Sequence, residues 1–207
     1  MNIKEAITRL YERLPVEERQ SFSVIRGYGG DKGGAVHRFI QCGGGRPIED
    51  SIDEATQTVI DFNNNKLNTN FCIGLADAVP EPGKGLSVEM VTGLFGFFSD
   101  VDIQHEAHGN GKRYPPTVED ALWCLEGLKP TWTINSGHGI QAVYLFEEPY
   151  FFENTADKNK ITKLSFRLGQ SIRNRARRKG WELDATHEFT RGFRLPGTLN
   201  YKGGGGG

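Results

Sequence analysis

The chain has 207 residues, of which 37% are hydrophobic and 25% are charged, and its formal net charge is −1. This length can bury a full core, as one large domain or as two small lobes, and no apolar run approaches the roughly 20 residues that span a bilayer. The N-terminal segment is amphipathic and charged, unlike a signal peptide, and the three cysteines are widely separated. These features disfavour a disulfide framework and a CxxC-type zinc site. We therefore expect a cytoplasmic protein.

The charge is unevenly distributed along the chain. Residues 160–202 contain eleven Lys and Arg against three acidic residues, a net charge of +8, whereas residues 1–159 carry a net charge of −9. A basic part beside an acidic part indicates a polyanionic partner on one face. The basic run 163–179 is also typical of a helix face exposed to solvent, and the sequence leaves both interpretations open.

The N-terminal third predicts two helices and three strands. The helices are expected at 2–14 and 51–64, the second capped by Ser51, and the strands at 21–25, 36–40 and 71–76. Glycines surround the run 36–40, as in a hairpin. A phosphate-binding loop is the alternative there, although neither Gly-Lys-Ser/Thr nor GxGxxG accompanies it.

An apolar, aromatic-rich run at Leu94–Ile103 predicts a buried strand that ends in two carboxylates. Residues i and i+2 of a strand point to the same face, so Asp100 and Asp102 share a face, with side chains that start roughly 6–7 Å apart. Carboxylates so placed can bridge one or two hard cations such as Mg²⁺ or Mn²⁺. The alternative is a core strand whose two Asp only begin the polar loop 104–114.

A helix capped by Thr117 is predicted at 117–128, and a hairpin follows it. The hairpin joins strands at 131–135 and 140–146 through the turn Ser136-Gly137-His138-Gly139. Two glycines let a chain approach a phosphate closely, and Ser and His side chains can donate to it. A plain hairpin is the alternative, although it needs no histidine.

The C-terminal part predicts a long basic helix at 159–178 that closes at Gly180. Its inward residues are expected to be Ile161, Leu164, Leu168 and Ile172. The run Trp181–Asp184 again has carboxylates at i and i+2, and residues 191–202 combine two arginines, a Pro-Gly-Thr turn, an asparagine and a lysine. Gly203–Gly207 is expected to be a flexible tail, a tag or a linker end.

Three blocks thus stand in order along the chain. They are Asp-x-Asp at 100–102, Ser-Gly-x-Gly at 136–139, and Asp184 followed by Arg-x-x-Arg-Leu-Pro-Gly-Thr-x-Asn-x-Lys at 191–202. Together they resemble the archaeo-eukaryotic primase superfamily, in particular the primase-polymerase domains of plasmids, phages and some CRISPR loci. The resemblance spans about residues 70–202, and its third block is the most specific; residues 1–70 carry no matching motif.

The resemblance implies an α/β (α+β) fold, with an N-terminal αβ lobe packed on an RRM-like antiparallel sheet and a catalytic cleft between them. It implies that Asp100, Asp102 and Asp184 are catalytic and bind two Mg²⁺ or Mn²⁺ ions. The nucleotide would be held by Ser136, Gly137, His138, Gly139, Gln141, Arg191, Arg194, Asn200 and Lys202. Residues 1–202 would form a single catalytic domain with its core at 71–202.

The function implied is DNA-templated nucleotidyl transfer, in which a DNA primase or polymerase synthesises or extends primers on single-stranded DNA from dNTPs or NTPs. The template would lie on the basic helix, at Arg173, Arg175, Arg177 and Arg178, and a helicase or another domain downstream in a longer protein is a candidate partner. Two alternatives stay open: a non-catalytic replication module that binds single strands, and a two-metal nuclease, since acids alone do not distinguish hydrolysis from synthesis.

One position departs from the family pattern. The family usually carries a histidine in the strand after the glycine turn, where this sequence has Gln141, and a histidine lies in the turn at His138 instead. Strand alternation puts Gln141 on the face opposite Ile140 and Ala142. We expect both His138 and Gln141 to contact the nucleotide, with His138 contributing more because a charge-assisted hydrogen bond is the stronger kind. The alternative is that Gln141 alone acts, through its neutral amide.

Overall fold

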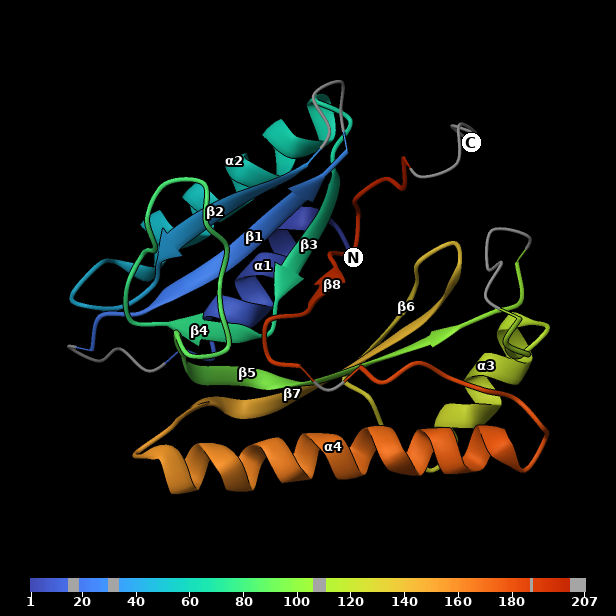
Figure 1. Ribbon diagram of the computed structural model, residues 1–207. Coiled ribbons are helices and arrows are strands. Elements are labelled where there is room, and N and C mark those ends of the chain that lie inside the picture. Colours follow the sequence, from blue (N-terminus) through green and yellow to red (C-terminus); the bar gives the residue numbers. More distant parts are fainter. Residues whose placement is uncertain (15–18, 30–33, 106–110, 187, 202–207) are drawn as a thin grey trace. The chain divides into compact units, whose positions relative to one another are not determined.

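The computed structural model describes residues 1–14, 19–29, 34–105, 111–186 and 188–201. Within these ranges it contains four helices and eight strands (Figure 1). The helices are α1 (Ile3–Tyr11), α2 (Ile48–Asn64), α3 (Val118–Leu125) and α4 (Thr155–Arg177). The strands are β1 (Phe22–Tyr28), β2 (Ala35–Gln41), β3 (Asn68–Cys72), β4 (Gly74–Ala76), β5 (Val91–Asp102), β6 (Trp132–Asn135), β7 (Gly139–Phe151) and β8 (Gly192–Arg194). The predicted α+β class is confirmed.

The strands of the described chain form one sheet in the order β6-β7-β5-β4-β1-β3-β8, and β2 pairs with β1. The β1–β2, β1–β3, β1–β4, β3–β8, β4–β5 and β6–β7 pairs are antiparallel, as the sequence predicts. Two compact units divide the chain: a first unit of Met1–Phe95, Phe146–Phe151 and Phe189–Gly207, and a second of Gly96–Leu145 and Phe152–Glu188. None of the helices in the described ranges has the length and apolar character needed to cross a membrane.

The first unit is built around buried aromatic rings. Phe71 of β3 packs against Tyr11, Phe95 and Phe193, with ring centroids 6.3, 5.3 and 5.8 Å away. Buried aromatic pairs stabilise a core through both their large apolar area and their ring geometry. In this unit α1 packs against α2, and α2 contacts β1, β2 and β3. The glycine-flanked run around β2 is thus half of a hairpin with β1.

The second unit has its own apolar core between two helices and two strands. It consists of Val101, Ala121, Cys124, Leu125, Ile140, Ala142, Ile172, Ala176 and Trp181. These residues come from β5, α3, β7 and α4, together with the segment that follows α4. Helices α3 and α4 therefore cover one face of the β5–β7 strands.

Several local predictions can be compared with the structure. Thr117 caps α3 as predicted, accepting from the Asp120 N–H at 3.2 Å, and α4 is closed by Gly180, whose φ is +73°. The predicted cap of α2 is wrong: the helix begins at Ile48, and Ser51 is buried inside it, donating from Oγ to the Gln41 carbonyl at 2.7 Å. The helix thus begins about one turn before the serine that was expected to cap it. The Ser51 hydroxyl bonds instead to Gln41, the last residue of β2.

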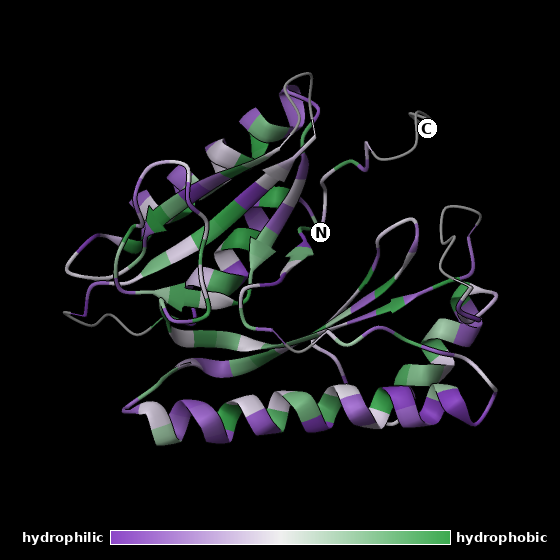
Figure 2. Ribbon diagram, viewed as in Figure 1, coloured by the Kyte–Doolittle hydropathy of each residue, from purple (hydrophilic) through white to green (hydrophobic). Residues whose placement is uncertain are grey.

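The predicted inner face of α4 is partly wrong. Ile161 and Ile172 are buried, but Leu164 is 41% exposed. The helix also begins earlier than predicted, at Thr155, with Asn154 as its cap. Figure 2 shows hydrophilic and hydrophobic residues interspersed along α4. Because apolar residues occur on more than one side of such a helix, the helical period alone does not identify the side that is buried.

Candidate functional site

Strands β5 and β7 approach each other closely at two glycines of the second unit. A Cβ atom at Gly96 would lie 2.1 Å from the Tyr144 carbonyl oxygen, and one at Gly139 would lie 2.5 Å from the Val101 oxygen and 2.8 Å from the Asp102 Cα. Residue numbers thus rise along β5 while they fall along β7, as in an antiparallel pair. This register puts Gly139 beside Asp102.

The two carboxylates of β5 lie on the face that the helices do not cover. Val101, between them, is fully buried in the core with Ile140 and Ala142, so the alternating Asp100 and Asp102 point to the opposite face. Both are half-buried. Gln141 shares their face, because its Nε2 donates to Asp100 Oδ2 at 3.2 Å. The predicted faces of these residues are confirmed, while their roles stay predictions.

The glycine turn forms the tight hairpin expected from the sequence. Gly137 has a φ of +88°, a conformation that favours glycine. The Ser136 N–H donates to the Gly139 carbonyl at 2.9 Å, and the Gly137 N–H donates to the Asn135 side chain at 2.9 Å. The Ser136 and Gly137 amides therefore already have partners inside the turn.

The turn is fixed to the segment that follows β5. The His138 carbonyl accepts from the Ile103 N–H at 3.0 Å. The His138 ring meets the His105 ring edge to face, with centroids 4.9 Å apart. His138, which is half-buried, therefore lies opposite Ile103, the first residue after β5 and the neighbour of Asp102.

Asp184 is brought to this region by its neighbour Thr186. The Asp100 N–H donates to Thr186 Oγ1 at 3.2 Å, and two residues of chain span at most about 7 Å. Trp181 and Leu183 pack on the apolar core, and the alternating Asp184 is half-buried. The predicted alternation of this run is therefore present, and it places Asp184 on the chain segment next to Asp100.

A lysine that the sequence did not single out is bound to Asp184. Lys112 Nζ forms an ion pair with Asp184 Oδ1, and the Tyr114 hydroxyl donates to Asp184 Oδ2 at 3.4 Å. The hydrogen bond and the charge of Asp184 raise the pKa of Lys112, which keeps the ammonium charged. Lys112 was missed because it stands in a polar loop without a motif spacing.

The donor set matches the chemistry of a hard divalent cation, although it is not gathered into one site. Carboxylate oxygens are the ligands that Mg²⁺ and Mn²⁺ prefer, and Asp184 already holds a cationic group. In the described ranges, no three His, Cys, Asp or Glu side chains lie close enough together to hold a metal ion. The residues thus fit the predicted ions by type, and Asp184 is held by Lys112 in the arrangement observed.

The Arg-x-x-Arg part of the third block lies in the first unit, whereas Asp184 belongs to the second. Arg194 Nη1 donates to the Leu199 carbonyl at 2.8 Å, across a turn in which the Thr198 N–H donates to the Leu195 carbonyl at 3.2 Å. Gly197, with a φ of +85°, supports this turn. Arg191 is exposed and Asn200 half-buried, while Lys202 lies outside the described residues. Joint action of these side chains with the carboxylates stays a prediction.

Three of the four predicted template arginines lie on α4, and Arg178 is its C-terminal cap; the helix covers the sheet face opposite to Asp100 and Asp102. Arg173 is only 8% exposed. Arg175 pairs with Glu126 and lies 4.8 Å from the centre of the Trp123 ring. Arg177 and Arg178 are exposed. The structure therefore does not bring these arginines together with the carboxylates, and only Arg177 and Arg178 among the four are exposed.

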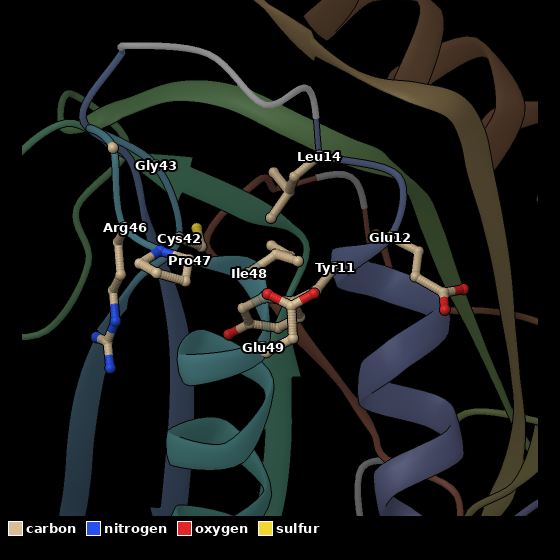
Figure 3. Close-up of a pocket in the computed structure, with 10 residues that line it drawn as sticks. Tyr11, Glu12, Leu14, Cys42, Gly43, Arg46, Pro47, Ile48 and Glu49 are labelled. Carbon is tan, nitrogen blue, oxygen red and sulfur yellow. The ribbon is translucent and has the colours of Figure 1, made fainter.

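A pocket of about 480 Å³ lies in the first unit beside α1 and the start of α2 (Figure 3). None of the predicted site residues lines it; Tyr11, Leu14, Cys42 and Pro47 are among those that do. Burial raises the pKa of the Cys42 thiol to about 12, so the thiol stays protonated and offers no thiolate nucleophile.

Comparison with known proteins bears on the fold. No protein-family model matches the sequence, and no curated protein matches it. The solved AEP domain of the primase-polymerase (PrimPol) from cyanophage S-2L is similar in structure, with a TM-score of 0.55 over 96% of this chain and 82% of that chain, at 18% sequence identity. The family that the three sequence blocks resemble is thus also the family of a solved structure with a similar fold. The chain has the fold of a primase-polymerase AEP domain.

Proposed function

We propose that the chain is a template-dependent nucleotidyltransferase that makes or extends primers on single-stranded DNA. One observation carries the proposal. Asp100 and Asp102 share with Gln141 the face of the β5–β7 strands that α3 and α4 do not cover (the open face), and they adjoin the Ser136–Gly139 turn, in a chain with the fold of a primase-polymerase domain. Carboxylates beside a glycine turn suit a reaction in which a triphosphate must be held and its charge neutralised.

The carboxylates are the proposed metal ligands. Asp100, Asp102 and Asp184 would hold two Mg²⁺ or Mn²⁺ ions, which supply positive charge to the entering and leaving oxygens when bound. The chain's own contribution is to fix the ligands. Gly139 packs on the backbone of Asp102, and Gln141 is proposed as a positioning residue whose amide orients the Asp100 carboxylate.

The turn is proposed to bind the triphosphate mainly through its side chains. Because the Ser136 and Gly137 amides have partners in the turn, His138 is the stronger candidate donor, and its contact to phosphate would be charge-assisted. We expect His138→Ala to raise the nucleotide KM more at pH 6 than at pH 8, whereas Gln141→Ala should lower kcat at both. If His138→Ala behaves as wild type and Gln141→Ala loses most activity, the histidine role is wrong.

Arg191, Arg194, Asn200 and Lys202 are proposed to neutralise the triphosphate, as the resemblance implies. Lys202→Gln and Arg191→Gln should raise the nucleotide KM while leaving binding of single-stranded DNA unchanged. Arg194→Gln also removes the bond to Leu199, so its effect on melting temperature must be measured alongside.

The experiment that tests the function uses the purified chain, single-stranded DNA template, labelled dNTPs or NTPs, and Mn²⁺ or Mg²⁺, with and without an annealed primer. Products longer than the primer, or new short products without it, support the proposal. Shortened DNA would instead indicate a two-metal nuclease. DNA binding without any incorporation would indicate a non-catalytic replication module. Asp102→Asn serves as the inactive control.

A further inference from the structure

Both carboxylate oxygens of Asp184 have a donor in this structure. Lys112 Nζ pairs with Oδ1, and the Tyr114 hydroxyl lies 3.4 Å from Oδ2. A carboxylate that serves as a metal ligand must offer at least one of these oxygens to the ion. A divalent ion at Asp184 and the Lys112 ammonium therefore compete for the same group.

Lys112 is held at this place by its neighbours in the chain. The Glu182 N–H donates to the Arg113 carbonyl at 2.8 Å, which fixes residues 112–114 alongside residues 182–184. On the other side, the Tyr114 N–H donates to Gln104 Oε1 at 3.1 Å, and Tyr114 is 1% exposed. The segment is thus anchored both to the chain segment that carries Asp184 and to Gln104, two positions beyond Asp102, so the ion pair is built into the fold.

The pair is nevertheless easy to displace. Its side chains are 37% and 42% exposed, and ion pairs at such exposure contribute little because water and salt screen them. A divalent ion carries twice the charge of an ammonium, and the lysine stem has several rotatable bonds through which it can withdraw.

We infer that Lys112 is a tethered counter-ion that occupies Asp184 until a divalent cation displaces it. This inference rests on the proposed function, because it takes Asp184 as a metal ligand. Removing the ammonium should free the carboxylate and remove a repelling charge, so that the divalent ion binds more tightly. The lysine thereby weakens metal binding in the nucleotide-free protein.

Binding of Mn²⁺ to the full chain, followed through the EPR signal of free Mn²⁺, tests the inference. We expect Lys112→Gln and Lys112→Ala to bind Mn²⁺ about two- to fivefold more tightly than wild type, the range given by a screened ion pair. Lys112→Arg, which keeps the charge, should stay close to wild type. Lys129→Gln, which removes an exposed lysine elsewhere in the second unit, should also leave Mn²⁺ affinity unchanged.

The controls separate this inference from the proposed function. Circular dichroism melting of each variant shows that it is folded before Mn²⁺ is added. Unchanged or weaker Mn²⁺ binding in both Lys112→Gln and Lys112→Ala, with wild-type binding that Asp102→Asn abolishes, would overturn the counter-ion role and leave the metal site standing. A tightening of the same size in Lys129→Gln would also overturn it, because net charge alone would then explain the effect. Absence of Mn²⁺ binding to wild type would instead contradict the proposed function.

Discussion

The two faces of the β5–β7 strands differ completely, although their residues alternate one by one. On one face, Val101, Ile140 and Ala142 are at most 2% exposed under α3 and α4. On the other, Asp100 and Asp102 are half-buried, and Gln141 bonds to Asp100. Because strand side chains have a period of two, a single pair of strands supplies both the core of the unit and its candidate site.

This division explains why polar residues can be placed so near a core. The fully buried Val101 stands between the two carboxylates and fixes the backbone, while the carboxylate side chains stay partly exposed. Substitutions on the two faces should therefore have different consequences: on the open face they should affect chemistry, and on the covered face they should affect stability. A shift of one residue in register would exchange the two faces.

The largest expected effect is on the open face. Asp100→Asn or Asp102→Asn should lower nucleotide incorporation by about 100-fold or more, since the charge that holds the ions is lost. The melting temperature should stay within a few degrees of wild type. Incorporation assays and circular dichroism melting check this together. Near-normal polymerisation by either variant would show that its carboxylate is not a metal ligand.

On the covered face, Ile140→Ala should lower the free energy of unfolding by about 2–5 kcal/mol, because it leaves a cavity in a packed core. The adjacent Gln141→Ala should cost less, about 1–3 kcal/mol, because it removes the bond of a buried amide to Asp100, but it should lower kcat. Urea titrations and steady-state kinetics on both variants provide the comparison. A large loss of stability in Gln141→Ala with unchanged kcat would reverse the assignment of the faces.

A substitution where β5 and β7 approach closely should have an intermediate effect on stability and on incorporation. Gly139→Ala would put a methyl group 2.5 Å from the Val101 oxygen, so it should destabilise by about 1–3 kcal/mol and also lower incorporation by moving Asp102. Gly127→Ala is the matched control. It has a φ of +82° with open space around it, and should cost about 1–2 kcal/mol through strain alone. Equal loss of activity per folded molecule in both variants would rule out a special role for Gly139.

The smallest effects are expected on α4. Arg178→Gln removes an exposed charge and should reduce the slope of log affinity for single-stranded DNA against log salt by about one, if Arg178 contacts a phosphate. Arg175→Gln should instead loosen the contact with Glu126 and Trp123, at a cost of less than about 1 kcal/mol. Fluorescence anisotropy at several salt concentrations measures the first effect. An unchanged slope would place the template away from this end of α4.

Features set by local pattern could be predicted from the sequence. The shared face of Asp100 and Asp102 follows from a period of two, the hairpin at 136–139 from its glycines, and the Thr117 cap from its position before an apolar run. Features set by tertiary contact could not. The position of Lys112 depends on two backbone segments far apart in sequence, and Gln141 meets Asp100 only because β7 pairs with β5.

The long basic helix α4 shows most clearly what could not be predicted from the sequence. Its charge indicates nucleic acid and its apolar period predicts a helix, but the period does not say which sheet face the helix covers. Packing of Ile172 and Ala176 on Val101 puts α4 on the face opposite to the carboxylates. Arg173 and Arg175 then contact neighbouring side chains of the unit, so charge counted along the sequence overstates the charge that α4 offers to a partner.

The most direct test of the central claim is to locate bound Mn²⁺ by paramagnetic broadening of amide signals in the NMR spectrum of the full chain with nucleotide present. Broadening falls steeply with distance from the ion. We predict that the signals of Asp100, Asp102, Gln141 and Asp184 are lost first, while those of Lys160, Lys163 and Arg167 on α4 persist. Early loss of the α4 signals, with those of Asp100 and Asp102 unaffected, would contradict the assignment of the open β5–β7 face as the metal and nucleotide site.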